Sequence, residues 1–132
     1  MKFRVLGAAL FLLMTSAVYG QRFNVPFAFH VGEQSLAAGT YNVSVASQSG
    51  LLMIRPQGSQ PIQAMPQGTV QATTIPSAGK LVFHRYGNNY FLSQIWRGGY
   101  EYGSQLKKTR AEREMAKAQT PAPDASVLAS LR

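Results

Sequence analysis

The strongest pattern in the sequence is an alternation of apolar and other side chains between residues 23 and 31. The apolar residues occupy every second position: Phe23, Val25, Phe27, Phe29 and Val31. A period of two is typical of a half-buried strand, so this segment is predicted to be a strand whose odd-numbered side chains face inward. Pro26 cannot donate a ladder hydrogen bond, which predicts that the strand lies at a sheet edge or begins with a bulge.

The same alternation returns further along the chain. Tyr41, Val43 and Val45 alternate with polar residues, and the segment is entered through Ala38-Gly39, where glycine supplies backbone freedom. Residues 51–55 form a short apolar run after a Ser- and Gly-containing turn. Two more strands are therefore predicted in this region.

Residues 56–79 contain no charged side chain, and the sequence Pro-Gln-Gly occurs twice there, at residues 56–58 and 66–68. Proline at the second position and glycine at the fourth are typical of a type I turn. We therefore expect a brief strand around Ile62 and Ala64, between the two turns, and another at residues 70–75.

A hairpin is predicted where two segments are rich in aromatic and β-branched side chains: residues 80–86 and 90–96. Gly87-Asn88-Asn89 separates them, and these residue types tolerate the positive φ angles of tight turns. Two registers are open. A turn at Asn88-Asn89 pairs Tyr86 with Phe91, whereas a three-residue loop pairs Tyr86 with Tyr90, and this shift exchanges the two faces.

A helix is predicted near the C-terminus, where four residues match a capping box: Thr109-Arg110-Ala111-Glu112. In that motif the threonine hydroxyl caps the backbone N–H of Glu112, and the carboxylate reaches back to the backbone of Thr109. Good helix formers continue as far as residue 118, giving a predicted helix over 110–118. About nine residues are too few for a stable isolated helix, so it is expected either to fray or to dock through three side chains: Ala111, Met115 and Ala118.

The first twenty residues have the layout of a secretory signal peptide, with a basic start, an apolar run and small residues after it. The apolar run has about half of the ~20 residues that a membrane-spanning helix needs, so no stable membrane span is expected after cleavage. Cleavage after Gly20 is preferred, and cleavage after Ala17 is the alternative. The protein is expected to be exported, to the periplasm or the extracellular space.

These elements predict an all-β fold: a small antiparallel β-sandwich or partly open barrel of about six to eight strands, with one short C-terminal helix. All eleven aromatic residues beyond the signal peptide lie between Phe23 and Tyr102, which places the core there. The predicted organisation is a signal peptide at 1–20, a β-domain at 21–106, a basic capped helix at 107–118 and a flexible C-terminal tail at 119–132.

The chemistry-bearing residues argue against an enzyme. The 132-residue chain has no cysteine, which excludes disulfides, zinc–thiolate sites and a cysteine nucleophile. The β-domain contains two carboxylates, Glu33 and Glu101, in turn or loop segments, and a serine triad would have to use His30 or His84. No G-x-S-x-G motif, phosphate-binding glycine pattern or metal-ligand spacing is present. We therefore predict no catalytic, metal or cofactor residues.

The charge is compatible with binding, although a solvated basic helix face that keeps the protein soluble also explains it. The chain has 13 Lys and Arg against 5 Asp and Glu, for a net charge of +8. Two groups of residues form a possible binding surface: His84, Arg85, Tyr86, Trp96 and Arg97 on the hairpin, and Lys107, Lys108, Arg110 and Arg113 around the helix. The favoured function is a non-catalytic envelope or extracellular module that binds or scaffolds. Its basic helix residues suit anionic envelope components or another exported protein. The alternative function is an anion, polyanion or single-stranded nucleic-acid binder that uses the aromatic and basic hairpin face, although the same rings suit a core.

Several motifs together resemble a family of short exported bacterial proteins of unassigned activity. They are FxVPFxFxVG at residues 23–32, LxAGxYxV at 36–43, LVFHRYGxxYFLSQ at 81–94 and RAERE at 110–114. The resemblance implies an exported β-domain with a terminal helix and carries over no catalytic or binding residue. Ala37 departs from the pattern, where proline is usual. The motif at 36–43 alone is also similar to a strand of prealbumin-like sandwich modules.

Overall fold

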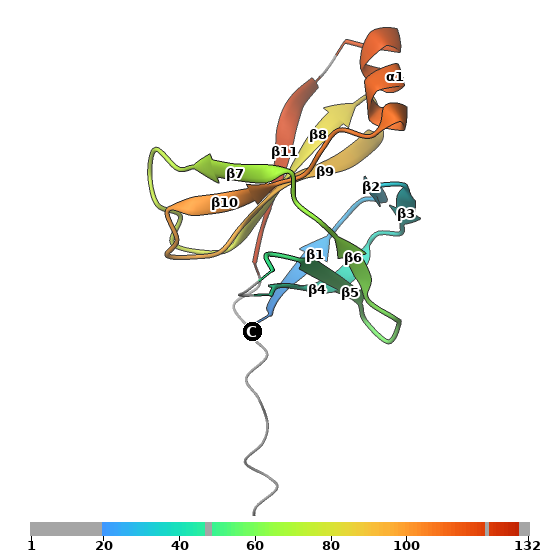
Figure 1. Cartoon of the computed structure of the whole chain (residues 1–132). Coiled ribbons are helices and arrows are strands. Elements are labelled where there is room, and N and C mark those ends of the chain that lie inside the picture. Colours follow the sequence, from blue (N-terminus) through green and yellow to red (C-terminus); the bar gives the residue numbers. More distant parts are fainter. Residues whose placement is uncertain (1–19, 47–48, 121, 130–132) are drawn as a thin grey trace, which may run out of the picture.

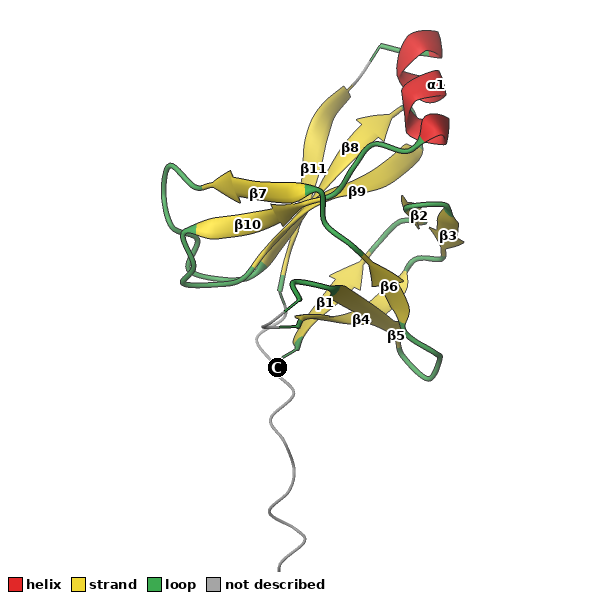
Figure 2. Cartoon of the chain, viewed as in Figure 1, coloured by secondary structure: helices red, strands yellow, loops and turns green. Residues whose placement is uncertain are grey.

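The computed structural model describes residues 20–46, 49–120 and 122–129, and it contains two β-sheets and one helix (Figure 1; Figure 2). The predicted signal peptide lies outside the described residues except for Gly20. The first sheet has the order β1-β4-β5-β6, with strands β1 (Gln21–Val25), β4 (Gly39–Val45), β5 (Leu52–Pro56) and β6 (Ile62–Ala64).

The second sheet has the order β11-β8-β9-β10-β7, with strands β7 (Gly68–Gln71), β8 (Lys80–Tyr86), β9 (Asn89–Trp96), β10 (Tyr102–Gln105) and β11 (Ala122–Leu128). A small hairpin of β2 (Phe29–Val31) and β3 (Gln34–Leu36) joins β9, and helix α1 (Arg110–Ala118) follows β10. The fold class is therefore the predicted β-sandwich with one short helix. Its eleven described strands exceed the predicted number because several are only three or four residues long.

The first strand ends earlier than the alternation predicts. β1 stops at Val25, the chain bends at Pro26 to Ala28, and β2 then forms a single parallel bridge to β9 between His30 and Phe91. Proline has no N–H to continue the ladder, so the chain leaves the first sheet there and joins the second. The prediction that the odd-numbered side chains face inward is confirmed at Phe29 and Val31, which are each only 2% exposed.

The core lies between the two sheets and is built from the alternating positions. Phe29 of β2 packs edge-to-face against Tyr41 of the first sheet and against Phe83 of the second, with ring centroids 5.1 and 5.3 Å apart. Such edge-to-face contacts are favourable beyond the area that they bury. One aromatic ring therefore connects the two layers where the chain crosses between them.

The hairpin turn differs from both predicted registers. β8 and β9 are joined by Gly87-Asn88, so Tyr86 pairs with Asn89 rather than with Tyr90 or Phe91. Gly87 has a φ of +64°, a left-handed conformation that glycine adopts without strain. Further along the hairpin, Val82 pairs with Gln94 but Phe83 pairs with Leu92, so Ser93 is the extra residue of a β-bulge.

The C-terminal segment was predicted to be a flexible tail, and that prediction is wrong. Residues 122–128 form β11, which pairs antiparallel with β8 from Arg85 to Lys80. Val127 and Ala125 pack on the core, and Ala129 bridges to Phe23 of the first sheet. The proline-rich composition misled the prediction, because proline is tolerated at a sheet edge and β11 is the edge strand. The strand predicted at residues 70–75 is also displaced, since β7 covers Gly68–Gln71.

Gly103 in β10 is required by a close packing contact. A Cβ atom at this position would lie 2.6 Å from Cδ2 of the Trp96 indole, which is only 5% exposed. We expect Gly103→Ala to lower the free energy of unfolding by about 1–3 kcal/mol through overpacking. Urea denaturation measures this change, with Gly39→Ala as the control because no atom lies within 4 Å of its Cβ position. Equal stability of the two variants would contradict the contact.

Candidate functional site

Helix α1 begins with the predicted cap but uses its glutamate differently. The backbone N–H of Glu112 donates to the Thr109 hydroxyl at 3.1 Å, as a capping box requires. The Glu112 carboxylate, however, turns away from Thr109 and into the protein, where the residue is 3% exposed. The second half of the predicted capping box is therefore wrong, because partners on the sheet compete for the carboxylate.

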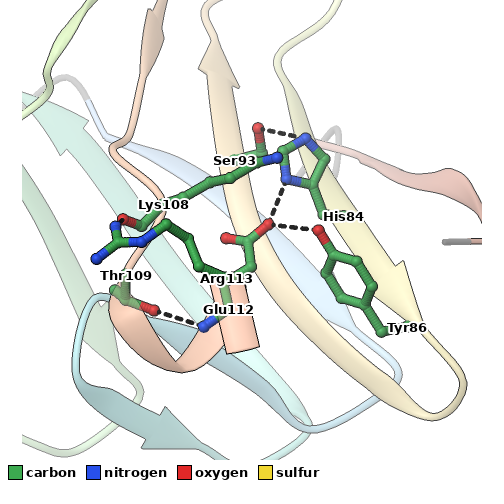
Figure 3. Close-up of polar contacts among 7 residues, drawn as sticks. All are labelled: His84, Tyr86, Ser93, Lys108, Thr109, Glu112 and Arg113. Carbon is green, nitrogen blue, oxygen red and sulfur yellow. Dashed lines mark hydrogen bonds and ion pairs between the residues drawn. The ribbon is translucent and has the colours of Figure 1, made fainter. Parts of the chain in front are cut away.

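Those partners form a network between the helix and the hairpin (Figure 3). Oε2 of Glu112 lies 2.7 Å from Nδ1 of His84 and accepts a hydrogen bond from the Tyr86 hydroxyl at 3.0 Å. Because a carboxylate only accepts, Nδ1 carries a proton, and in the neutral ring Nε2 is left to accept from the Ser93 hydroxyl at 3.2 Å. The bulge at Ser93 places its hydroxyl beside His84. We call these four residues the helix anchor: His84, Tyr86, Ser93 and Glu112.

The anchor replaces the apolar docking that the sequence predicts. Ala111 and Ala118 are exposed, so the expected contacts through them are not made. Met115 is half-buried, as expected of a docking residue, and its sulfur lies 3.9 Å from the Asn89 amide nitrogen. The helix is thus held mainly by a buried carboxylate, which explains how nine residues remain helical with little apolar area.

Burial and the hydrogen bond to Glu112 raise the pKa of the Tyr86 phenol to about 12. The fold therefore favours the protonated phenol, and its contribution to stability is fully present below the unfolded pKa of about 10. That contribution is lost as the pH rises through about 12. We expect Tyr86→Phe to flatten the dependence of unfolding free energy on pH across this window. Urea titrations at several alkaline pH values measure it, with Tyr102→Phe, at an exposed ring, as the control. An unchanged dependence in Tyr86→Phe would contradict this.

A hydrogen-bonded series of serine, histidine and an acidic residue also occurs in hydrolases, where an exposed serine attacks the substrate. Here Ser93 is 3% exposed, and neither Ser93 nor His84 lines the groove described below. A nucleophile must be reached by a substrate carbon at about 3 Å, which this burial opposes. We therefore interpret the network as structural. The sequence contained Ser93 and Glu112, but nothing in their local pattern indicated that they meet His84.

A groove of about 500 Å³ lies beside the start of the helix. One wall is the segment from Leu106 to Arg113, a second is the β2–β3 turn around Gly32 and Glu33, and the third is β6 with Met65. Leu106 is buried, and its backbone N–H donates to the Ser93 carbonyl at 2.8 Å, which fixes the chain before the basic residues begin. The helix anchor then fixes the chain at Glu112, after Arg110 and directly before Arg113.

The basic wall of this groove contains all four helix-region residues that the sequence proposed: Lys107, Lys108, Arg110 and Arg113. All four side chains are exposed. Among residues 20–46, 49–120 and 122–129, the only basic side chain within 4 Å of a carboxylate is His84, beside Glu112, so these cations have no carboxylate partner there. Arg113 donates to the Lys108 carbonyl at 2.9 Å, which ties the two ends of the wall together. Glu33, in the β2–β3 turn, is the one carboxylate among the residues that line the groove.

The five hairpin residues do not join this wall. Tyr86 and Trp96 are 3% and 5% exposed, so their rings belong to the interior. Arg85 donates to the Gly87 carbonyl, and the Arg97 guanidinium lies 3.9 Å from the centre of the Tyr100 ring. His84 belongs to the helix anchor. Buried rings cannot stack on a nucleic-acid base, and the core interpretation of this hairpin is confirmed.

The described residues contain no cluster of three or more side chains suited to a metal ion. Within the same part of the chain, no helix is long and apolar enough to cross a bilayer. Comparison with family models, curated proteins and solved structures finds no match to this chain. The resemblance to a family of short exported proteins therefore stays a prediction, and the function is argued from the groove itself.

Proposed function

We propose that this chain is a non-catalytic binding module of the cell envelope, exported by residues 1–20, that recognises anionic partners through the basic groove. The observation that carries the proposal is a wall of four cations on a concave surface that form no ion pair with any carboxylate in the described part of the chain. A basic helix face that served only to keep the protein soluble would not require a groove, nor a backbone held in place at both ends of the basic segment. Here the backbone is held on one side by Leu106 and on the other by Glu112, so the cations are presented by a positioned segment.

The position of the wall adds to its positive potential. Arg110 begins α1 and Lys108 lies two residues before it, so both lie near the helix N-terminus, where the helix dipole favours negative charge. The apolar side chains of Ile62 and Met65 face the same groove. Such a site suits a ligand that has both negative charge and some apolar surface. The buried hairpin rings disfavour the alternative of base stacking.

The test is a charge reversal at the groove with an equal reversal elsewhere. Lys108→Glu/Arg110→Glu removes two cations from the wall. The control, Arg22→Glu/Arg55→Glu, makes the same change in net charge at two exposed positions that flank Asn42 on the first sheet. We expect the groove variant to bind a soluble polyanion, heparin, about tenfold more weakly or worse, and the control to change less, because contact charges outweigh distant screened ones.

Fluorescence anisotropy of labelled heparin against salt concentration measures both variants. Wild-type affinity should fall steeply as salt rises, since the attraction is electrostatic. Equal losses in the two double variants would mean that only net charge matters, and the groove would then not be the binding site.

A further inference from the structure

Among the strands that the structure describes, none pairs with the outer edge of β6, which forms one wall of the groove. It is the last strand of the first sheet and pairs with β5 through Ile54–Ile62, Met53–Gln63 and Leu52–Ala64. In an antiparallel ladder, successive residues direct their N–H and C=O groups to opposite sides. The residues of β6 whose backbone N–H and C=O groups point away from β5 are therefore either Gln63 or both of its neighbours.

This strand lines the groove over its whole length. Residues 62–65 line it together with Lys107, Lys108 and Arg110 of the basic wall. From this juxtaposition we infer that the occupant of the groove is an extended acidic segment of another protein chain, added as a strand to the edge of β6. The inference rests on the function proposed above and names the partner class for the same site.

The composition of the edge favours such an addition. Sheet edges are commonly protected by charged side chains, but residues 56–79 contain none. Pro61 and Pro66 bracket β6 and limit an added strand to a few residues, so the main-chain pairing would be short. A short pairing requires a further source of affinity, and the basic wall supplies it.

The pattern expected of the partner follows from strand geometry. Every second side chain of an added strand lies on the same face, so a segment with acidic residues at alternate positions presents its carboxylates on one side. Those carboxylates would meet Lys108 and Arg110 while the backbone pairs with Gln63 or its neighbours. The combination of backbone pairing and charge is the recognition mode of β-strand addition. A lipid headgroup would use the cations but not the strand edge.

The experiment uses a fluorescein-labelled peptide with alternating glutamate and valine and two N-methylated versions of it. One version is methylated at the backbone nitrogens of the glutamates, and the other at those of the valines. Methylation removes the N–H donors of one peptide edge and keeps every charge. We expect the parent peptide to bind and one methylated version to lose at least tenfold in affinity, while the other binds nearly as the parent does. Amide exchange at Gln63 or its neighbours should slow on binding the parent peptide.

Three results would overturn the inference. Equal binding of all three peptides would show charge attraction without strand pairing, and heparin binding through the groove would still stand. A parent peptide that fails to bind while heparin binds would exclude strand addition and would leave the binding of anions by the groove in place. Binding of phosphatidylglycerol vesicles through Lys108 and Arg110, with no peptide binding, would assign the groove to a lipid surface. Failure of the proposed function itself is distinguished by heparin binding that the groove variant leaves unchanged.

Discussion

Replacing Val127 by aspartate is expected to lower the free energy of unfolding by about 3 kcal/mol, and so the Tm by roughly 10–20 °C, for a domain of this size. Val127 lies on β11 opposite Leu81, and it packs against the core shared by the two sheets. A carboxylate there would lose water without gaining a partner. Thermal unfolding followed by circular dichroism measures the change.

The neighbouring residue supplies the control. Leu128 lies on the same strand but is 63% exposed, so Leu128→Asp should change stability by no more than about 0.5–1 kcal/mol. Similar effects at the two positions would mean that β11 is not packed as described. Deleting residues 119–132 should be at least as damaging as Val127→Asp, because it would leave β8 without one of its two neighbours. A deletion that leaves the Tm unmoved would restore the interpretation of this segment as a tail.

Glu112→Ala is expected to cost about 2–4 kcal/mol of folding free energy, because it leaves the buried Tyr86 hydroxyl and the His84 ring without their shared acceptor. The helix would lose its main attachment to the sheet, so the basic wall should also lose its fixed position. We therefore expect heparin binding to weaken in this variant even under conditions where the sheets remain folded. Chemical denaturation and heparin anisotropy measure the two effects.

Glu114→Ala is the matched control, since Glu114 is an exposed glutamate on the same helix. It should change stability by no more than about 0.5 kcal/mol. Glu112→Gln keeps the side-chain shape and one acceptor oxygen, so it should fall between the two. If Glu112→Ala is as stable as Glu114→Ala, the helix does not depend on its buried carboxylate.

The parts of the fold that the sequence predicted are those with local causes. The parity of Phe23, Val25, Phe29 and Val31 follows from the pleat of a strand, and the limits of α1 follow from the cap at Thr109 and the helix formers after it. The four cations of the groove wall could be named because they lie within seven residues of one another. That they share one groove could not be seen, since β6 and the β2–β3 turn come from distant parts of the chain.

The wrong predictions have causes that lie far away in the sequence. Gly87-Asn88 and Asn88-Asn89 have similar turn chemistry, so the choice between them depends on packing across the whole hairpin. β11 contains Pro123 and looks like a linker, yet the open edge of β8 accepts it. Glu112 matches a local motif, but two donors on the hairpin offer a buried site that the local backbone cannot match. Tertiary contacts decided each case.

The bridge between Phe23 and Ala129 joins the beginning and the end of the described chain. Ala129 also donates its N–H to the carbonyl of Gly79, which closes the same corner. A chain emerging from the ribosome therefore cannot close this corner until Ala129 has been synthesised, more than 100 residues after Phe23. Because such distant contacts close large loops, we expect folding to be slow compared with that of a helical protein of equal length.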